Sequence, residues 1–408
     1  MDRRNALIAG ISYFLIYLAA PVVYLGVVQA GLCDKLGASA TVANLPSSAY
    51  LFGSFAPIVV AWAAPHRLTR AVVVWSYGTT AALLGVVAAT LLLPFSNSAR
   101  IAAVVGQGLV QGVSGSVAGV YAYQCLRVGT TIEGRARALR ISLGYGPLFG
   151  VAGSLGAQLV LAGGIPAIRY PLDYALLYLV GVPCMAGVAL LSLGYRLADV
   201  AEEPRRPLLR YLGEGIRAYL RNRELLLLFL AYFLWYFTLN AMPNLSLYTR
   251  EAVHREPKDL SGAIMALRFG FKAVAGLALP ALMLRRSIRA PLTATVLLLG
   301  ASIAWAWSAP GYYYLVAFGL MGAGELGGGY FPIYAITVST ASVAALNLSI
   351  LTLVTPASSI APVLHGALTD HFGFRGSFAL GGITAAAALW LVMKLPAKTD
   401  GEQAGSTR

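Results

Sequence analysis

The chain has 408 residues, of which 58% are hydrophobic and only 11% are charged, and its mean hydropathy is +0.72. Soluble domains carry about 25% charged residues, so this composition excludes a soluble globular protein and predicts an all-α protein that crosses a membrane many times. The net charge of +14 resembles that of nucleic-acid-binding proteins, but the charges follow the predicted membrane topology, and no nucleic-acid partner is expected.

Apolar runs of about 20 residues recur along the whole chain, as membrane-spanning helices require. The first run is too long for a signal peptide and lacks a small-residue cleavage site, so we expect it to remain as the first span. Twelve spans are predicted, at residues 6–32, 44–64, 70–94, 101–124, 138–163, 172–196, 224–248, 260–284, 290–309, 312–338, 342–367 and 375–396.

The basic residues fall mostly on one side of this predicted topology. With the N-terminus inside, 21 of the 30 Lys and Arg residues lie in segments predicted to be cytoplasmic, and 7 lie in segments predicted to be outside. This positive-inside bias places both termini in the cytoplasm. The expected location is the cytoplasmic (inner) membrane of a bacterium, where the chain is a multi-pass protein.

The longest polar interruption, PRRPLLRYLGEGIRAYLRNR at residues 204–223, follows the sixth span. It divides the chain into an N-terminal six-helix bundle (1–197), a cytoplasmic linker (198–223), a C-terminal six-helix bundle (224–396) and a disordered tail (397–408). Apolar linker residues recur at helical spacing opposite arginines. The linker is therefore either an amphipathic helix on the inner membrane face or a tether that anchors by charge.

A layout of six plus six spans around a basic central loop resembles the major facilitator superfamily of secondary transporters. Three local motifs support the resemblance. HGALTDHFGFRGSF, before the last span, resembles a recurrent family pattern through Gly366, Asp370, Gly373 and Arg375. GYGPLFGVAG in the fifth span resembles the core of the antiporter motif through Gly146, Pro147 and Gly150. VVGQGLVQGVSG in the fourth span resembles an R-x-x-Q-G motif through Gln111 and Gly112, with Gly108 in the arginine position.

The resemblance implies alternating access between two six-helix halves. It also implies gating or structural roles for the seven motif residues, three in the fifth span and four around the connection between the eleventh and twelfth spans. It implies no cofactor and no metal. The solute is expected to be a small molecule, a coupling proton is a further expected partner, and the protein is expected to work in the bilayer as a monomer.

Three ionisable residues lie at mid-depth in the predicted spans. Arg268 and Lys272 interrupt GAIMALRFGFKAVAGLALPALM, and Glu325 lies in GLMGAGELGGGYFPIY. Each such residue costs about 2.5–3.5 kcal/mol at a helix centre, so all three should face a cavity or one another. Arg268 and Lys272 share one helix face because they are four residues apart.

One carboxylate cannot neutralise two cations, so this set carries a surplus positive charge. An anionic substrate is the expected counter-charge, since arginine binds carboxylate or phosphate with a planar fork and lysine acts as a movable point charge. A structural alternative stays open, in which Arg268 and Glu325 brace the C-terminal half and Lys272 snorkels to the inner interface. Glu325 is also the candidate carrier of a coupling proton.

Polar faces in three other spans add further candidates. Gln107 and Gln111 share a face of the fourth span, and Tyr13, Tyr17 and Tyr24 lie on one side of the first. Tyr232, Tyr236, Asn240 and Asn244 follow at steps of four in the seventh. Such faces either line a cavity or join helices. We favour the cavity for Asn240 and Gln111, and the membrane interface for Tyr24 and Tyr121. The predicted substrate-binding residues are Arg268, Lys272, Asn240, Tyr236, Gln111, Gln107 and Tyr17.

The sequence thus predicts a secondary active transporter of a small organic anion that works by alternating access, with proton coupling as a further hypothesis. Two alternatives stay open: a broad-specificity drug or metabolite exporter with structural buried charges, and a transport-inactive membrane scaffold or assembly factor. No His/Asp, His/Glu or Ser/His cluster occurs at a spacing suited to catalysis, and no predicted extramembrane loop is large enough to form a site, so we do not expect an enzyme. The four histidines, His365 among them, lie in or near predicted loops and are expected to be solvated.

Overall fold

The computed structural model describes residues 2–63, 68–130, 134, 138, 140–197, 208–339 and 344–397, and these residues contain helices and no strand. The predicted tail at 397–408 lies outside the described residues except for its first residue. Among the described residues, eight segments are long and apolar enough to cross a membrane. They are Thr69–Leu92, Asn97–Leu126, Leu172–Ser192, Arg223–Leu247, Pro257–Met283, Arg289–Ser308, Asn347–Phe372 and Phe374–Lys394.

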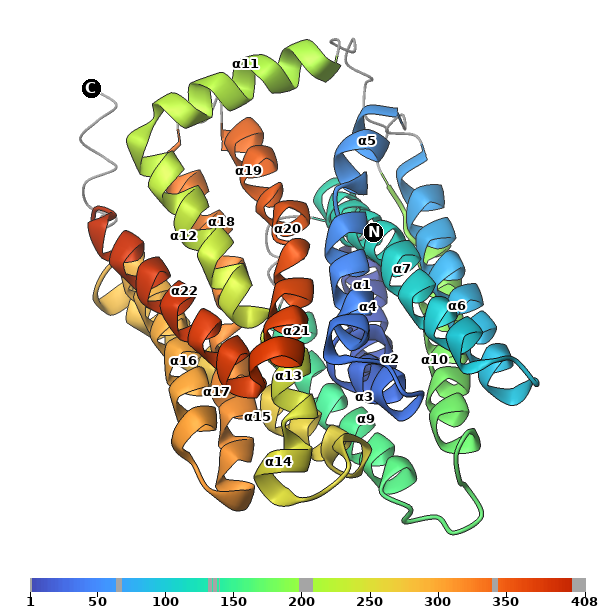
Figure 1. The fold of residues 1–408 in the computed structure, drawn as a ribbon. Coiled ribbons are helices and arrows are strands. Elements are labelled where there is room, and N and C mark those ends of the chain that lie inside the picture. The colour runs from blue at the N-terminus through green and yellow to red at the C-terminus, as the bar shows by residue number, and fades with distance from the viewer. Residues whose placement is uncertain are drawn as a thin grey trace, which may run out of the picture.

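The helices form two groups that lie side by side, coloured blue to green and yellow to red in Figure 1. The first group contains α1 (Asp2–Leu18), α2 (Ala20–Val23), α3 (Val27–Lys35), α4 (Ala40–Gly53), α5 (Ala56–Ala63), α6 (Thr69–Leu92), α7 (Asn97–Gly129), η2 (Arg140–Tyr145), α9 (Gly146–Leu161) and α10 (Leu172–Ser192). The linker residues form α11 (Leu208–Arg221), which lies across one end of the molecule. We call this end the α11 end.

The second group follows α11 along the chain. It contains α12 (Arg223–Leu239), α13 (Met242–Leu247), α14 (Thr249–Val253), α15 (Pro257–Arg285), α16 (Arg289–Ser308), η3 (Gly311–Leu315), α17 (Val316–Gly324), α18 (Gly327–Thr337), α19 (Ala344–Thr352), α20 (Val354–Ala357), α21 (Ile360–Phe372) and α22 (Phe374–Lys394).

Several predicted spans are broken helices. The first span is interrupted between α1 and α3, where Gly26 takes a φ of +134° that a side chain would strain. The tenth span is interrupted at Glu325 and Leu326, between α17 and α18. Irregular backbone at membrane depth is tolerated where it lies within protein or lines a cavity. The breaks therefore mark places where the backbone approaches the interior of the molecule.

Each group has its own apolar core, and one residue from each group packs into the core of the other. Trp235 and Phe331 are fully buried in the second group, and Leu84 and Tyr178 are fully buried in the first. Tyr17 of α1 packs into the core of the second group, and Leu247 of α13 packs into that of the first. These two contacts show that apolar side chains pack directly between the groups.

The two groups meet closely at the end opposite α11, which we call the closed end. There α9 crosses α15, and α4 crosses α21. Glycine permits both crossings: a Cβ added at Gly262 would lie 2.2 Å from the carbonyl oxygen of Ser154, and one added at Gly366 would lie 2.6 Å from the Cα of Thr41. Backbones this close leave no space for a larger side chain.

A buried polar chain also joins the two groups at the closed end. Asn44 Nδ2 donates to Asn244 Oδ1 at 2.6 Å, and Asn244 Nδ2 donates to Ser377 Oγ at 3.0 Å. His365 Nδ1 lies 2.8 Å from Ser377 Oγ, and His365 Nε2 lies 2.8 Å from the carbonyl oxygen of Phe237. Because a carbonyl only accepts, Nε2 carries the proton.

The expectation that His365 is solvated is wrong, because its side chain is fully buried. Its proximity to a predicted loop is misleading: α12 and α22 supply both of its hydrogen-bond partners. Those partners lie 12 and 128 residues away in sequence, so the local sequence pattern does not reveal them.

Candidate functional site

A cavity of about 1470 Å³ lies between the two groups. Its lining reaches the α11 end through Phe55, Tyr145 and Met283. Toward the closed end the lining includes Tyr24 and Pro243, and the Asn44–Asn244 hydrogen bond lies beyond them. The cavity therefore extends toward the α11 end and is bounded at the other by the helix crossings.

The three ionisable residues predicted at mid-depth meet at the wall of this cavity. Arg268 Nε lies 2.9 Å from Glu325 Oε2, and Lys272 Nζ lies 3.2 Å from Glu325 Oε1. Their side chains are 7%, 13% and 15% exposed, in the order Arg268, Lys272 and Glu325. Within the described part of the chain, no other Asp, Glu, Lys or Arg lines the cavity. We call these residues the charged cluster, and its net charge is +1.

Helix geometry explains why the cluster assembles. Arg268 and Lys272 lie one turn apart on α15, and Glu325 lies at the break between α17 and α18. Gly322 lets α17 approach α15 at this level, because an added Cβ would lie 2.2 Å from the carbonyl oxygen of Arg268. Lys272 pairs with Glu325 and does not extend away to the interface, so the snorkelling alternative does not describe this structure.

Tyr24 is the functional candidate that sequence reasoning missed. It was expected at the membrane interface, but its ring lines the cavity beside both cations. The guanidinium carbon of Arg268 lies 5.8 Å from the ring centroid, and Lys272 Nζ lies 5.7 Å from it. Both distances are within the range of cation–π attraction. The spacing of Tyr24 with Tyr17 on one helical side was the available signal, but the helix break shifts Tyr24 inward.

The other predicted substrate-binding residues differ in access to the cavity. Asn240 and Tyr236 line it; Asn240 Nδ2 donates to the carbonyl of Tyr236 at 2.7 Å, and Thr355 Oγ1 donates to the hydroxyl of Tyr236 at 3.2 Å. Tyr17 also contributes to the lining but is only 4% exposed, since it stacks on Tyr24 and meets Phe269 edge to face.

The two glutamines of α7 hydrogen-bond to backbone carbonyls of the first predicted span. Gln107 is fully buried and is not among the cavity-lining residues, and its Nε2 donates to the carbonyl of Val22 at 2.9 Å. Gln111 lines the cavity, but its Nε2 donates to the carbonyl of Val23 at 2.5 Å. Both amides thus satisfy carbonyls released by the break in the first span. In this conformation a solute in the cavity would not reach Gln107.

The motif glycines of α9 form a slot for aromatic rings at the contact between the groups. A Cβ at Gly146 would lie 2.6 Å from the ring of Tyr17, and one at Gly150 would lie 3.0 Å from the ring of Phe269. Pro147 lines the cavity between them. Because Phe269 follows Arg268 directly, this slot lies next to the charged cluster.

The motif residues of α21 lie at the closed end. Asp370 binds the first turn of α4: its Oδ1 accepts from the amide of Ala40 and its Oδ2 from the amide of Thr41, each at 2.9 Å. Gly373 has a φ of +70° between α21 and α22, a conformation that favours glycine. Arg375 is exposed. Asp370 thus caps a helix of the opposite group.

Replacing Asp370 with asparagine should weaken closure of this end. The carboxylate neutralises the positive end of the α4 dipole and satisfies two helix amides, so its loss should shift the closed–open equilibrium by about 1 kcal/mol toward separation. Spin labels on Lys35→Cys and Arg255→Cys would report the distance between the groups, and all three native cysteines are buried. Arg375→Gln is the matched control. An unchanged distance distribution in Asp370→Asn would contradict the capping role.

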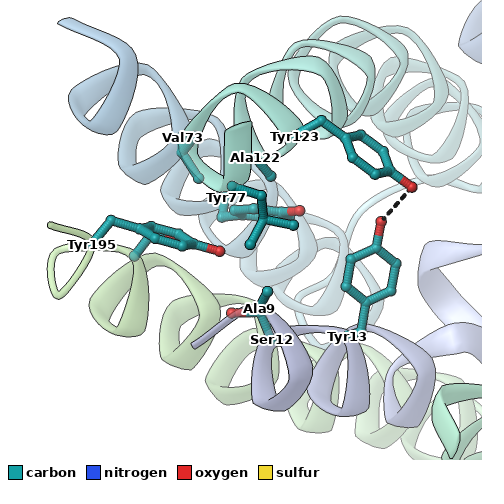
Figure 2. Close-up of a pocket in the computed structure, with 10 residues that line it drawn as sticks. Ala9, Ser12, Tyr13, Val73, Tyr77, Ala122, Tyr123 and Tyr195 are labelled. Atoms are coloured by element: carbon teal, nitrogen blue, oxygen red, sulfur yellow. Dashed lines mark hydrogen bonds between the residues drawn. The ribbon is translucent and has the colours of Figure 1, made fainter. Parts of the chain in front are cut away.

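A small second pocket opens among phenol rings in the first group, as Figure 2 shows. Tyr13, Tyr77 and Tyr123 line both this pocket and the large cavity, and the hydroxyls of Tyr13 and Tyr123 lie 3.4 Å apart. Ser12 Oγ is buried here without a hydrogen-bond partner among the described residues. The pocket volume of about 10 Å³ is close to the space needed for one water molecule. A single water therefore suits the pocket, and a solute does not.

Comparison with solved structures finds transporters of similar architecture. A point mutant of the nucleoside transporter NupG aligns with a TM-score of 0.73 at 14% identity, over 96% of this chain and 98% of that one. A D-xylose–proton symporter aligns with a TM-score of 0.69 at 13% identity, over 97% and 98%. FucP, a major facilitator superfamily transporter in the outward conformation, aligns with a TM-score of 0.63 at 14% identity, over 97% and 99%.

No protein-family model and no curated protein matches the sequence. At 13–14% identity, the structural likeness shows the fold and not the solute. It extends over nearly the whole length of each chain. The chain therefore has the fold of the major facilitator superfamily of transporters.

Proposed function

We propose that the protein is a secondary active transporter of a small organic anion. The observation that carries the proposal is the charged cluster: two cations and one carboxylate lie at the wall of the cavity, with a net charge of +1. A surplus charge with little access to water is costly unless a counter-charge joins it. An anion in the cavity would supply that counter-charge.

The fold and the cavity support alternating access as the mechanism. The structural neighbours include proteins named as a nucleoside transporter and a D-xylose–proton symporter, which move small solutes. The cavity extends to the α11 end, and the α9–α15 and α4–α21 crossings bound it at the other. Transport requires these crossings to separate while the α11 end closes.

The proposal includes a topology of twelve spans in two six-helix halves, residues 1–197 and 224–396, joined by the linker at 198–223. The four spans beyond the eight long segments would come from the broken or shorter helices α1–α3, α4–α5, α9 and α17–α18. The excess of arginine near the α11 end supports placing that end, and both termini, in the cytoplasm. The membrane would be the inner membrane of a bacterium, and the protein would act as a monomer.

The proposed substrate site consists of Arg268, Lys272, Tyr24, Tyr236 and Asn240, all of which line the cavity. Gln111 is included because it lines the cavity, although its Oε1 accepts from Gln107 Nε2 at 3.1 Å and its Nε2 donates to Val23. Tyr17 would support the ring of Tyr24, on which it stacks. The buried cluster is what separates this proposal from a transport-inactive scaffold, which has no need for three ions at mid-depth.

A ligand screen by thermal stabilisation tests the proposal. Wild-type protein should be stabilised by one or more organic anions, and Arg268→Ala and Lys272→Ala should lose that stabilisation. Arg255→Ala removes an exposed cation outside the cavity and should behave as wild type. If both cluster variants keep the response to every anionic ligand, the cluster is not the substrate site. Stabilisation by uncharged drugs alone would favour the broad-specificity exporter.

Proton coupling through Glu325 is a separate prediction of this proposal. The carboxylate contacts both cations, so its protonation would release them toward the solute and link proton binding to anion binding. Uptake or efflux by proteoliposomes should then fall when a protonophore collapses the proton gradient. A rate that is the same with and without the gradient would show that no proton is coupled.

A further inference from the structure

The charge of the cluster restricts the charge of its ligand. Arg268, Lys272 and Glu325 sum to +1, and within the described residues no other charged side chain lines the cavity. A ligand with one negative charge brings the local total to zero. A dianion would leave one negative charge over, and an uncharged ligand would leave one positive charge over, each at an electrostatic cost in a region of low dielectric.

The donors of the cluster suit a carboxylate. Arg268 Nε donates to Glu325. Among the described residues, its Nη1 has a hydrogen bond only to the sulfur of Met265, at 3.8 Å, and thioether sulfur is a weak acceptor. The guanidinium edge is therefore short of oxygen acceptors in a side chain that borders the cavity. Lys272 donates to Glu325 through one of its three N–H groups. Two oxygens of one ligand group can occupy these remaining donors.

The aromatic lining of the cavity suits a ligand with a flat ring system. Eleven of its lining residues are aromatic, and they come from both groups of helices. Examples are Tyr24, Tyr50, Phe55, Tyr145, Tyr236 and Tyr330. Aromatic rings bind other rings by offset stacking and edge-to-face contacts, and tyrosine adds a hydroxyl that can hydrogen-bond to a polar substituent of the ligand.

Resting on the proposed function, we infer that the ligand is a singly charged aromatic acid, and that the net charge of the cluster sets the charge that the site prefers. Variants that change the net charge of the cluster should therefore change the ligand charge that the site prefers. Glu325→Gln raises the cluster to +2 and should favour a dianion. Lys272→Gln lowers it to zero while keeping the Arg268–Glu325 pair, and should favour an uncharged ligand.

Three probes with one ring system test this directly: 2-naphthoate, naphthalene-2,3-dicarboxylate and 2-naphthamide, which carry one, two and no negative charges at the same edge. Isothermal titration calorimetry on the purified full-length protein would give their affinities. Wild type should prefer naphthoate over both others by about tenfold or more. The preference should move to the dicarboxylate in Glu325→Gln and to the amide in Lys272→Gln.

Matched controls and contrary outcomes are available in the same chain. Glu251→Gln and Arg255→Gln make the same charge changes at exposed positions outside the cavity and should keep the wild-type order. If Glu325→Gln does not fold, the probe order measured for Lys272→Gln tests the inference alone. The same probe order in wild type and the cluster variants would overturn the inference, as would the absence of naphthoate binding. If the dicarboxylate binds best to wild type and its binding requires Arg268, the inferred preference for a single charge is wrong, whereas the proposed transport of an organic anion is still supported.

Discussion

Glu325→Ala is expected to destabilise the protein by about 3–5 kcal/mol, the cost of removing one partner from a buried ion pair. The carboxylate is the partner of two cations, at 2.9 and 3.2 Å, so its removal leaves both Arg268 and Lys272 without an anion at mid-membrane. The cavity gives all three side chains a little exposure, so water would moderate the loss and the lower end of this range is expected.

Unfolding of the purified protein in detergent, followed by helical circular dichroism, would measure this loss. Glu251→Ala removes an exposed carboxylate and should change stability by less than about 0.5 kcal/mol. The double variant Glu325→Ala/Lys272→Ala should recover part of the loss, because one of the two unpaired cations is gone. A Glu325→Ala protein as stable as wild type would show that the cluster is hydrated and not an ion-pair network.

Gly262→Ala is expected to block transport without unfolding either group of helices. The added Cβ would lie 2.2 Å from the Ser154 carbonyl oxygen and 2.4 Å from the Gln158 amide nitrogen. These are backbone atoms, so the clash cannot be relieved by a change of side-chain rotamer. Overpacking of this kind costs about 1–3 kcal/mol or more. The upper value corresponds to a shift of about a hundredfold in the population of the closed end.

The distance between labels at Lys35→Cys and Arg255→Cys should lengthen in Gly262→Ala, and solute exchange should fall to background. Gly270→Ala is the matched control on the same helix, because a Cβ there has nothing within 4 Å and should leave both readouts unchanged. If Gly262→Ala exchanges solute at the wild-type rate, the α9–α15 crossing does not have to form during the cycle.

The charged cluster could be found from sequence because ions at mid-membrane are rare and expensive. Arg268, Lys272 and Glu325 are conspicuous in apolar runs, and simple charge counting requires them to share an interior location. The same reasoning does not reach Tyr24, since tyrosine is common at both interfaces and in cavities. Its position depends on the break between α1 and α3, which turns its ring toward α15.

Other features depended on contacts between segments distant in sequence. Gln107 and Gln111 share one helix face, yet only Gln111 lines the cavity. Both amides bind carbonyls at the break in the first span, and periodicity in the sequence does not show that break. His365 appears close to a loop but is buried by α12 and α22. The α21 motif was recognised by its pattern, whereas the capping of α4 by Asp370 follows from the helix crossing.

Counterflow across proteoliposomes shows whether the charged cluster binds the transported anion. Vesicles would be loaded with the anion that stabilises the wild-type protein most, and entry of its radiolabelled form would be followed with no other gradient. We expect rapid counterflow by wild type and Arg255→Ala, and none above background by Arg268→Ala or Lys272→Ala. Counterflow at the wild-type rate in both Arg268→Ala and Lys272→Ala would contradict the claim that the cationic surplus in the cavity binds the transported anion.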